Sequence, residues 1–245
     1  MKYREFRNLL RSLIKEVVET KQRTIYVLVG PPAIGKSTWI KKTFKEKKPY
    51  IINRDDIVEK VAESYGWTYD DMFAAPPQNK EEIDKASKDK NFKEILNKFG
   101  KIVDSPSYMT WQPFSFSKVV EANNEVFSKF QQRVSNAHPS GEDIVIDMTN
   151  MNVNSRKGAL KAIENNEQDY RKVAVVFSFK GNEELVQRIA AKRSEIAKSM
   201  GKNKTIPKSA IERMMSSYQE VSDSEGFDEV ISVDNVSALK NSLRS

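Results

Sequence analysis

The sequence predicts an α/β fold built on a parallel β-sheet, and three observations lead to it. Short apolar runs alternate with segments of helical pattern along the chain. These runs are continuously apolar, as in parallel strands that are buried on both faces. A glycine-rich segment, GPPAIGKST at 30–38, directly follows the first run. The 245 residues, 38% of them hydrophobic and 31% charged, suffice for one sizeable soluble domain with an insertion.

Strands are expected at 24–29, 49–53, 144–147, 173–179 and 228–233. Helices are expected at about 36–44, 57–65, 116–134, 154–166, 183–200 and 207–220, with a short helix at the end of the chain. Residues 1–23 are predicted to form an N-terminal amphipathic helix, because their apolar side chains recur at helical spacing.

Residues 66–120 interrupt this alternation, and we predict that they form an inserted, mainly helical subdomain of a single domain spanning 1–245. The segment holds several prolines, a charged helical piece around 78–99, and the aromatic residues Trp67, Tyr69, Phe73, Tyr108 and Trp111. Two interpretations stay open. The aromatic and basic side chains suit a grip on nucleic acid or on an unstacked base, or they form the core of the subdomain.

The segment from Gly30 to Thr38 fits the pattern G-x-x-x-x-G-K-[ST] between a strand and a helix. Such a loop curls its backbone N–H groups around phosphates at the positive end of the helix. Lys36 is expected to reach the β- and γ-phosphates of ATP, and Ser37 to hold Mg²⁺. The residues expected to bind the nucleotide are Gly30, Pro31, Pro32, Ala33, Ile34, Gly35, Lys36, Ser37 and Thr38. The fold class is therefore a P-loop NTPase of kinase type, a three-layer sandwich with a parallel sheet.

Acidic residues end the second and third strands. Ligands of open α/β sheets bind outside the carboxyl ends of the strands, which places Asp55 near the γ-phosphate as a general base. Asp56 is expected to cap the next helix. Asp147 is expected to orient the Mg²⁺ shell or to pair with a basic substrate-binding residue. Polar groups nearby are expected to face the substrate: Arg54, Asp147, Thr149 and Asn150.

A basic helical segment over 183–206 is expected to act as a lid. Positive charge stabilises the oxygens of a phosphoryl group in transfer. The spacings of four and five residues suggest that Lys192 and Arg193 lie near the same face as Arg188. Arg188 and Arg193 are the expected catalytic residues of this lid, with Lys192 as the alternative to Arg193.

The composition narrows the partners. Lys and Arg exceed Asp and Glu by seven, which favours polyanionic partners such as nucleic acid. The chain has no Cys and one His, His138, which argues against thiolate and imidazole metal centres and fits a reducing, cytoplasmic location. No apolar run reaches 18 residues, so no membrane span is expected. Nothing in the sequence indicates an obligate protein partner.

Five segments in order, GPPAIGKST, INRDD, IDMTNMN, the basic lid helix with IPKSAIERM, and SEGFDEVISV, resemble the kinase domain of bacteriophage polynucleotide kinases. The resemblance covers roughly 24–60 and 143–234. It implies transfer of phosphate from ATP to the 5′-hydroxyl of DNA or RNA, with Asp55 as base, Asp147 as essential acid, and Arg188 and Arg193 as lid arginines.

Three departures from the family pattern bear on the acceptor. Val58 stands where the family usually has another Arg, three residues after the base Asp. Lys60 is the nearby residue that offers a replacement positive charge, but a lysine cannot make the two parallel hydrogen bonds of an arginine. The lid arginines are five residues apart rather than four, and no D-x-D-x-T phosphatase segment is present. Related phage kinases phosphorylate 5-hydroxymethyluracil within DNA, which is the alternative acceptor. A nucleoside, sugar or antibiotic kinase is a further alternative, and an ATPase or nucleotide switch without an acceptor is the last.

Overall fold

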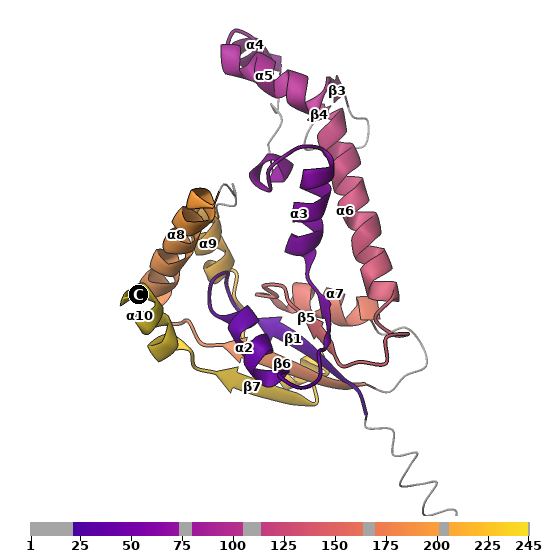
Figure 1. Cartoon of the computed structure of the whole chain (residues 1–245), viewed down its shortest axis with the longest axis vertical. Helices are drawn as coiled ribbons and strands as arrows, with labels where there is room; N and C mark the ends of the chain where they lie inside the picture. Colours follow the sequence, from indigo (N-terminus) through magenta and orange to yellow (C-terminus); the bar gives the residue numbers. More distant parts are fainter. Residues whose placement is uncertain (1–21, 74–79, 105–113, 164–169, 201–205, 245) are drawn as a thin grey trace, which may run out of the picture.

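The sheet has the parallel arrangement that the sequence predicts. The structure, a computed structural model, describes residues 22–73, 80–104, 114–163, 170–200 and 206–244. These residues form a five-stranded parallel sheet in the order β2-β5-β1-β6-β7 (Figure 1). The strands are β1 (Thr24–Val29), β2 (Tyr50–Ile52), β5 (Ile144–Ile146), β6 (Arg171–Phe177) and β7 (Glu229–Val233). The helix predicted over 1–23 lies outside the described residues, apart from 22 and 23, which are not helical.

Helices cover both faces of the sheet and make it the middle of three layers. Leu28 and Phe177 pack on one side against α2 (Lys36–Thr43), α8 (Glu183–Ser199), α9 (Lys208–Ser216) and α10 (Val236–Arg244). Ile25 and Val27 face the other side, against α6 (Ser117–Ser135) and α7 (Val153–Ile163). The alternation along β1 follows from the two-residue period of a strand. The predicted three-layer α/β fold is confirmed.

The predicted insertion packs as an extension of α3 (Arg54–Ser64) and α6, which lie side by side and run outward from the sheet (Figure 1). Its elements are η1 (Asp70–Phe73), α4 (Lys80–Ala86), α5 (Lys90–Phe99), β3 (Ile102–Asp104) and β4 (Phe114–Phe116). A third buried cluster joins them, including Trp67, Phe99 and Phe116. The antiparallel β3–β4 pair departs from the expected helical content, and residues 117–120 belong to α6.

The second helix of the sequence begins earlier than predicted. We expected it at residue 57 with Asp56 as its cap, but α3 begins at Arg54 and Asn53 is the N-cap. The side-chain oxygen of Asn53 accepts a hydrogen bond from the Asp55 backbone N–H at 2.8 Å. Asn is as good an N-cap as Asp, so the shorter connection leaves both aspartates in the first turn.

Val58, which stands where the resemblance leads us to expect an Arg, is a core residue. It is 2% exposed and packs in the third cluster with Val61 and Phe116. A guanidinium at this buried position would need partners that the apolar cluster does not supply. Lys60 is exposed on the same helix.

Among the described residues, no helix combines the length and apolar character of a membrane span.

Candidate active site

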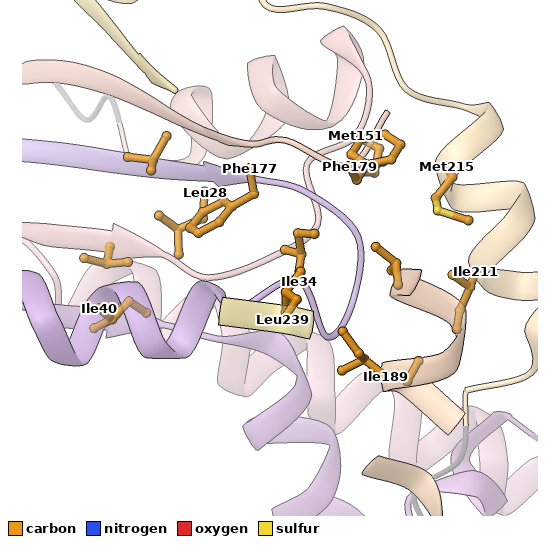
Figure 2. Close-up of a cluster of buried hydrophobic side chains, with 14 of the residues drawn as sticks. Leu28, Ile34, Ile40, Met151, Phe177, Phe179, Ile189, Ile211, Met215 and Leu239 are labelled. Atoms are coloured by element: carbon orange, nitrogen blue, oxygen red, sulfur yellow. The ribbon is translucent and has the colours of Figure 1, made fainter. Parts of the chain in front are cut away.

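The loop at 30–38 is anchored from below and from both sides. Ile34 is 1% exposed and packs among the buried side chains under the loop (Figure 2). The Gly30 N–H donates to the Thr149 carbonyl at 2.9 Å, and Asn235 donates from Nδ2 to the Ile34 carbonyl at 3.3 Å. The loop is therefore held between the end of β1, the segment after β5 and the start of α10.

The backbone of this loop is bent in a way that suits phosphate binding. Gly35 lies in the left-handed region with φ 98°, and Ala33 does so with φ 65° although it carries a Cβ. A side chain at Gly35 would also meet Nδ2 of Asn235 at 2.9 Å. Pro31 and Pro32 have no N–H, so the phosphate donors come from the later loop residues and the first turn of α2, whose N–H groups lack helical partners.

Lys36 lies against the loop that precedes it. Its Nζ donates to the carbonyls of Gly30 and Pro31, each at 3.0 Å. Burial lowers the pKa of the Lys36 ammonium to about 8, while the carboxylates of Asp147 and Asp55 act in the opposite direction. Lys36 and both acids therefore share one electrostatic environment at the carboxyl edge of the sheet.

Two strand ends meet at this edge. The Asp147 N–H donates to the Ile52 carbonyl at 2.9 Å, which continues the β2–β5 pairing past the strands. Asn53 donates from Nδ2 to Oδ2 of Asp147 at 3.3 Å. Burial raises the pKa of Asp147, Lys36 lowers it, and Asp55 and Asp56 raise it. The structure thus brings together the acids that the sequence placed at separate strand ends.

Asp55 is exposed in the first turn of α3 and has one partner from the predicted insertion. The Tyr69 hydroxyl donates to Oδ1 of Asp55 at 3.1 Å. Burial and the charge of Asp55 raise the pKa of Tyr69, which keeps this hydroxyl a donor. One carboxylate oxygen of Asp55 is oriented in this way, and the group remains accessible to an acceptor.

The remaining predicted substrate residues divide into two kinds. Arg54 is exposed beside Asp55, and Thr149 is partly exposed at the loop. Asn150 is only 2% exposed and donates from Nδ2 to the Leu28 carbonyl at 2.9 Å, with φ 44°. This burial does not fit the prediction that Asn150 contacts substrate, because its amide ties the segment after β5 to β1.

The two predicted lid arginines lie on different faces of α8, which corrects the expectation of a shared face. Five residues of an α-helix turn the side chain by about 140°. Arg193 is close enough to Lys36 to lower its pKa. Arg188 is exposed and lines a hollow of about 610 Å³ with Glu184 and Lys240. Four residues turn the side chain by only about 40°, so Lys192 is on the same side of α8 as Arg188. Residues 201–205 of the predicted lid lie outside the described residues.

The residues at this edge fit a magnesium ion as well as a nucleotide. Mg²⁺ takes oxygen ligands and binds through one or two carboxylates together with substrate phosphates. Ser37 is exposed in the first turn of α2. The charges of Asp55 and Asp56 help to raise the pKa of Asp147, and a bound cation would relieve this repulsion between carboxylates. In the described ranges, no group of three or more His, Cys, Asp or Glu is placed so that it could hold a metal ion by itself.

Three residues near the site have contacts there that the sequence did not predict. Asn53 precedes the two aspartates, and its place before an acidic first turn is an N-cap signal. Tyr69 is 14 residues from Asp55 in the sequence, and no local sequence pattern predicts their contact. Arg156 is 0% exposed and pairs with Glu225 at 2.7 and 2.8 Å while donating to the Asn150 carbonyl. Glu225 is the first residue of the EGFDEV segment, so this segment supports the loop after β5.

Comparison with known proteins places this site in a family. The family model described as AAA domain matches residues 25–221. No curated protein matches the sequence. A chain from the PezAT toxin–antitoxin system of Streptococcus pneumoniae is similar at 15% identity and TM-score 0.43, covering 82% of this chain and 67% of that one.

Two further solved structures are similar over most of their length. A candidate kinase from Chloroflexus aurantiacus shares 11% identity at TM-score 0.45, with 91% of this chain and 94% of that one covered. A gluconokinase from Sinorhizobium meliloti shares 15% identity at TM-score 0.35, with 91% and 88% covered. The phosphate loop, both acidic strand ends and all of α9 lie within the family match, which spans most of the chain, so the chain belongs to the AAA domain family.

Proposed function

We propose that this protein is an ATP-dependent kinase that transfers the γ-phosphate of ATP to a hydroxyl of nucleic acid, most simply the 5′-hydroxyl of a polynucleotide, with Mg²⁺ bound at Ser37. The observation that carries the proposal is the position of Asp55. It is an exposed carboxylate that raises the pKa of Lys36, and it lies in the first turn of α3, directly after β2 and the N-cap residue Asn53. An acceptor hydroxyl at Asp55 would therefore face the phosphate that Lys36 holds.

In the proposed step, Asp55 takes the proton of the acceptor hydroxyl while its oxygen bonds to the γ-phosphorus. The bond from the γ-phosphorus to the bridging oxygen breaks, and ADP leaves. Lys36, the loop N–H groups and Arg193 stabilise the negative charge on the phosphate oxygens. Asn53 and Tyr69 hold Asp147 and Asp55 in place through the hydrogen bonds described above. Bound Mg²⁺ would neutralise charge on the phosphates.

Nucleic acid is favoured as the acceptor by charge and by the sequence resemblance. The chain has a formal charge of +7 at pH 7, and polyanions are attracted to such a surface. The segments INRDD and IDMTNMN, which resemble those of polynucleotide kinases, supply Asn53, Asp55 and Asp147 at one edge of the sheet. This edge is where the acceptor and the nucleotide have to meet.

The test is transfer of labelled γ-phosphate from ATP to three acceptors under the same conditions. They are a 5′-hydroxyl oligonucleotide, a 5′-blocked oligonucleotide with internal 5-hydroxymethyluracil, and a panel of nucleosides and sugars. The proposal expects label on the first, with an apparent KM that rises with salt, because phosphate contacts release counterions. Label on the second alone would identify a DNA-base kinase, and label on the panel alone a small-molecule kinase. Lys36→Ala should abolish transfer to whichever acceptor is used.

A further inference from the structure

The predicted insertion brings Tyr69 to Asp55 and Phe73 to Tyr69, whereas several of its other aromatic side chains are buried. Trp67, Phe99 and Phe116 are 7%, 3% and 2% exposed and form the core of the extension. Phe73 is 54% exposed, and its ring centroid lies 5.1 Å from that of the partly exposed Tyr69. Tyr108 and Trp111 lie outside the described residues. Phe73 and, in part, Tyr69 are therefore exposed to solvent, in contrast to the three core rings.

The short helix that carries Phe73 is firmly braced. The Asp71 carboxylate accepts the Thr68 N–H at 2.8 Å and pairs with the ammonium of Lys98 on α5. The neighbouring Met72 is 3% exposed in the core of the extension. An exposed ring on a fixed backbone loses little conformational freedom when it binds a ligand, so Phe73 is suited to be a contact surface.

Tyr69 connects this surface to the reaction centre. Its hydroxyl donates to Oδ1 of Asp55 at 3.1 Å, while its ring lies against Phe73. Arg54, which precedes Asp55, is exposed and acts electrostatically on Tyr69. Two rings, a guanidinium and the proposed base therefore lie in one group. Aromatic rings with nearby arginines are the means by which proteins bind unstacked bases and their phosphates.

We propose that Tyr69 and Phe73 form a platform on which the terminal base of the acceptor strand stacks, bringing its hydroxyl to Asp55. The proposal rests on the proposed nucleic-acid acceptor and specifies that the acceptor end is single-stranded or frayed. Tyr69 is in addition a positioning residue for Asp55, whereas Phe73 acts through its ring alone. Stacking depends little on sequence because every base has an aromatic face. The platform would therefore bind the terminal base of a strand whatever its identity.

The experiment uses the full chain and a 5′-hydroxyl oligonucleotide whose terminal base is 2-aminopurine, a fluorescent base quenched by stacking. Wild-type protein should quench the fluorescence on binding. Phe73→Ala should weaken binding about 5- to 150-fold, the usual value of one base–aromatic stack, and raise the oligonucleotide KM without raising the ATP KM. Phe73→Trp should restore both. Phe127, a 65% exposed phenylalanine on α6, supplies the matched control Phe127→Ala, which should behave as wild type.

Tyr69→Phe separates the two roles of Tyr69. It keeps the ring and removes the hydrogen bond to Asp55, so it should lower kcat several-fold while quenching and the oligonucleotide KM are retained. Tyr69→Ala should impair both kcat and KM. A Tyr69→Phe variant that loses quenching, or that keeps full kcat, would contradict the positioning role.

The outcomes separate this proposal from the proposed function. If wild type labels the oligonucleotide but Phe73→Ala behaves like Phe127→Ala, the platform is wrong and the kinase assignment is unaffected. If Phe73-dependent quenching occurs without transfer to any oligonucleotide, the platform stands and the acceptor assignment is wrong. Absence of quenching with wild type, at concentrations that saturate binding, overturns the platform. A double-stranded blunt end should quench less than a single strand, and equal quenching would contradict the requirement for an unstacked base.

Discussion

Asn53 donates from Nδ2 to Oδ2 of Asp147 at 3.3 Å and accepts the Asp55 N–H at 2.8 Å with its own oxygen. One side chain therefore caps α3 and links the ends of β2 and β5. The two acids at the site owe their relative placement to this residue. Its two hydrogen bonds can be separated by substitution, which gives a test of each.

Asn53→Asp should keep the cap and disrupt the link to Asp147. Aspartate caps helices as well as asparagine does, but it would place a second carboxylate where the amide donates now. We expect an unchanged melting temperature and a lower kcat. Asn53→Ala should lose both functions, with a stability loss of about 1 kcal/mol. Thermal unfolding and steady-state transfer measured on both variants check this, and equal kcat for wild type and Asn53→Asp would contradict the role of the link.

The two lid arginines should differ in effect because they face different sides of α8. Arg193 acts on Lys36, whereas Arg188 lines the hollow beside Lys240. Arg193→Ala should lower kcat by about 10-fold or more, as expected for a charge that stabilises the transferred phosphoryl group. Arg188→Ala should lower kcat less. Steady-state kinetics with both substrates varied would measure this difference, and the reverse order of effects would show that the arrangement of α8 changes when substrates bind.

ATP binding should weaken as pH rises through about 8. Burial lowers the pKa of Lys36 to about 8, so the ammonium loses its proton, and its attraction for phosphate, above that pH. The kcat/KM for ATP should therefore fall between about pH 7 and 9, the region about one unit on either side of this pKa. Lys36→Arg, which stays charged over this range, supplies the comparison. Its activity should be lower, but this alkaline fall should be absent. A fall of equal size in both proteins would assign the titration to another group.

The ion pair of Arg156 and Glu225 should contribute strongly to stability. Both side chains are buried, and the guanidinium also donates to the Asn150 and Gln219 carbonyls. Removing one partner of such a pair costs about 3–5 kcal/mol, so Glu225→Gln should unfold at much lower urea concentration at pH 7. The double variant Arg156→Met/Glu225→Leu should regain only part of the lost stability, because the carbonyls of Asn150 and Gln219 lose the guanidinium as their hydrogen-bond donor.

The same pair gives a pH dependence of stability with a defined sign. The hydrogen bond from Arg156 lowers the pKa of Glu225 in the folded protein. Its stabilisation is therefore complete above the unfolded pKa, about 4.3, and is lost as pH falls through the lower folded value. The difference in unfolding free energy between wild type and Glu225→Gln should be constant from pH 6 to 7 and shrink below about pH 4. A difference that grows on acidification would contradict this assignment.

The sheet and the phosphate loop could be predicted from the sequence because local patterns determine them. The apolar run TIYVLV forms β1 with the expected bounds, and Lys36 begins α2. The start of α3 was misplaced, since two aspartates and an asparagine compete for one cap and only the backbone geometry selects Asn53. The β3–β4 pair was not predicted, because each strand has only three residues and forms through its pairing with the other rather than through a local sequence pattern.

The residues around Asp55 could not be predicted in full because long-range packing places them. Tyr69 reaches the site only through the fold of the extension, whose core includes Trp67 and Phe99. The same packing explains Val58, which reads as a missing arginine in the sequence and is a core residue in the structure. Residue type alone also could not show that Asn150 is turned into the fold by its bond to Leu28.

The most direct test of the central claim compares Asp55→Asn with Asp56→Asn in transfer of labelled γ-phosphate to a 5′-hydroxyl oligonucleotide. The two aspartates are neighbours in the first turn of α3, both exposed, and only Asp55 is bonded by Tyr69. Asp55→Asn should bind ATP normally and lose about 10²–10⁴-fold in kcat, the usual contribution of a general base. Asp56→Asn should retain kcat within a few-fold of wild type. Full activity of Asp55→Asn, or an equal loss in both variants, would contradict the assignment of Asp55 as the base.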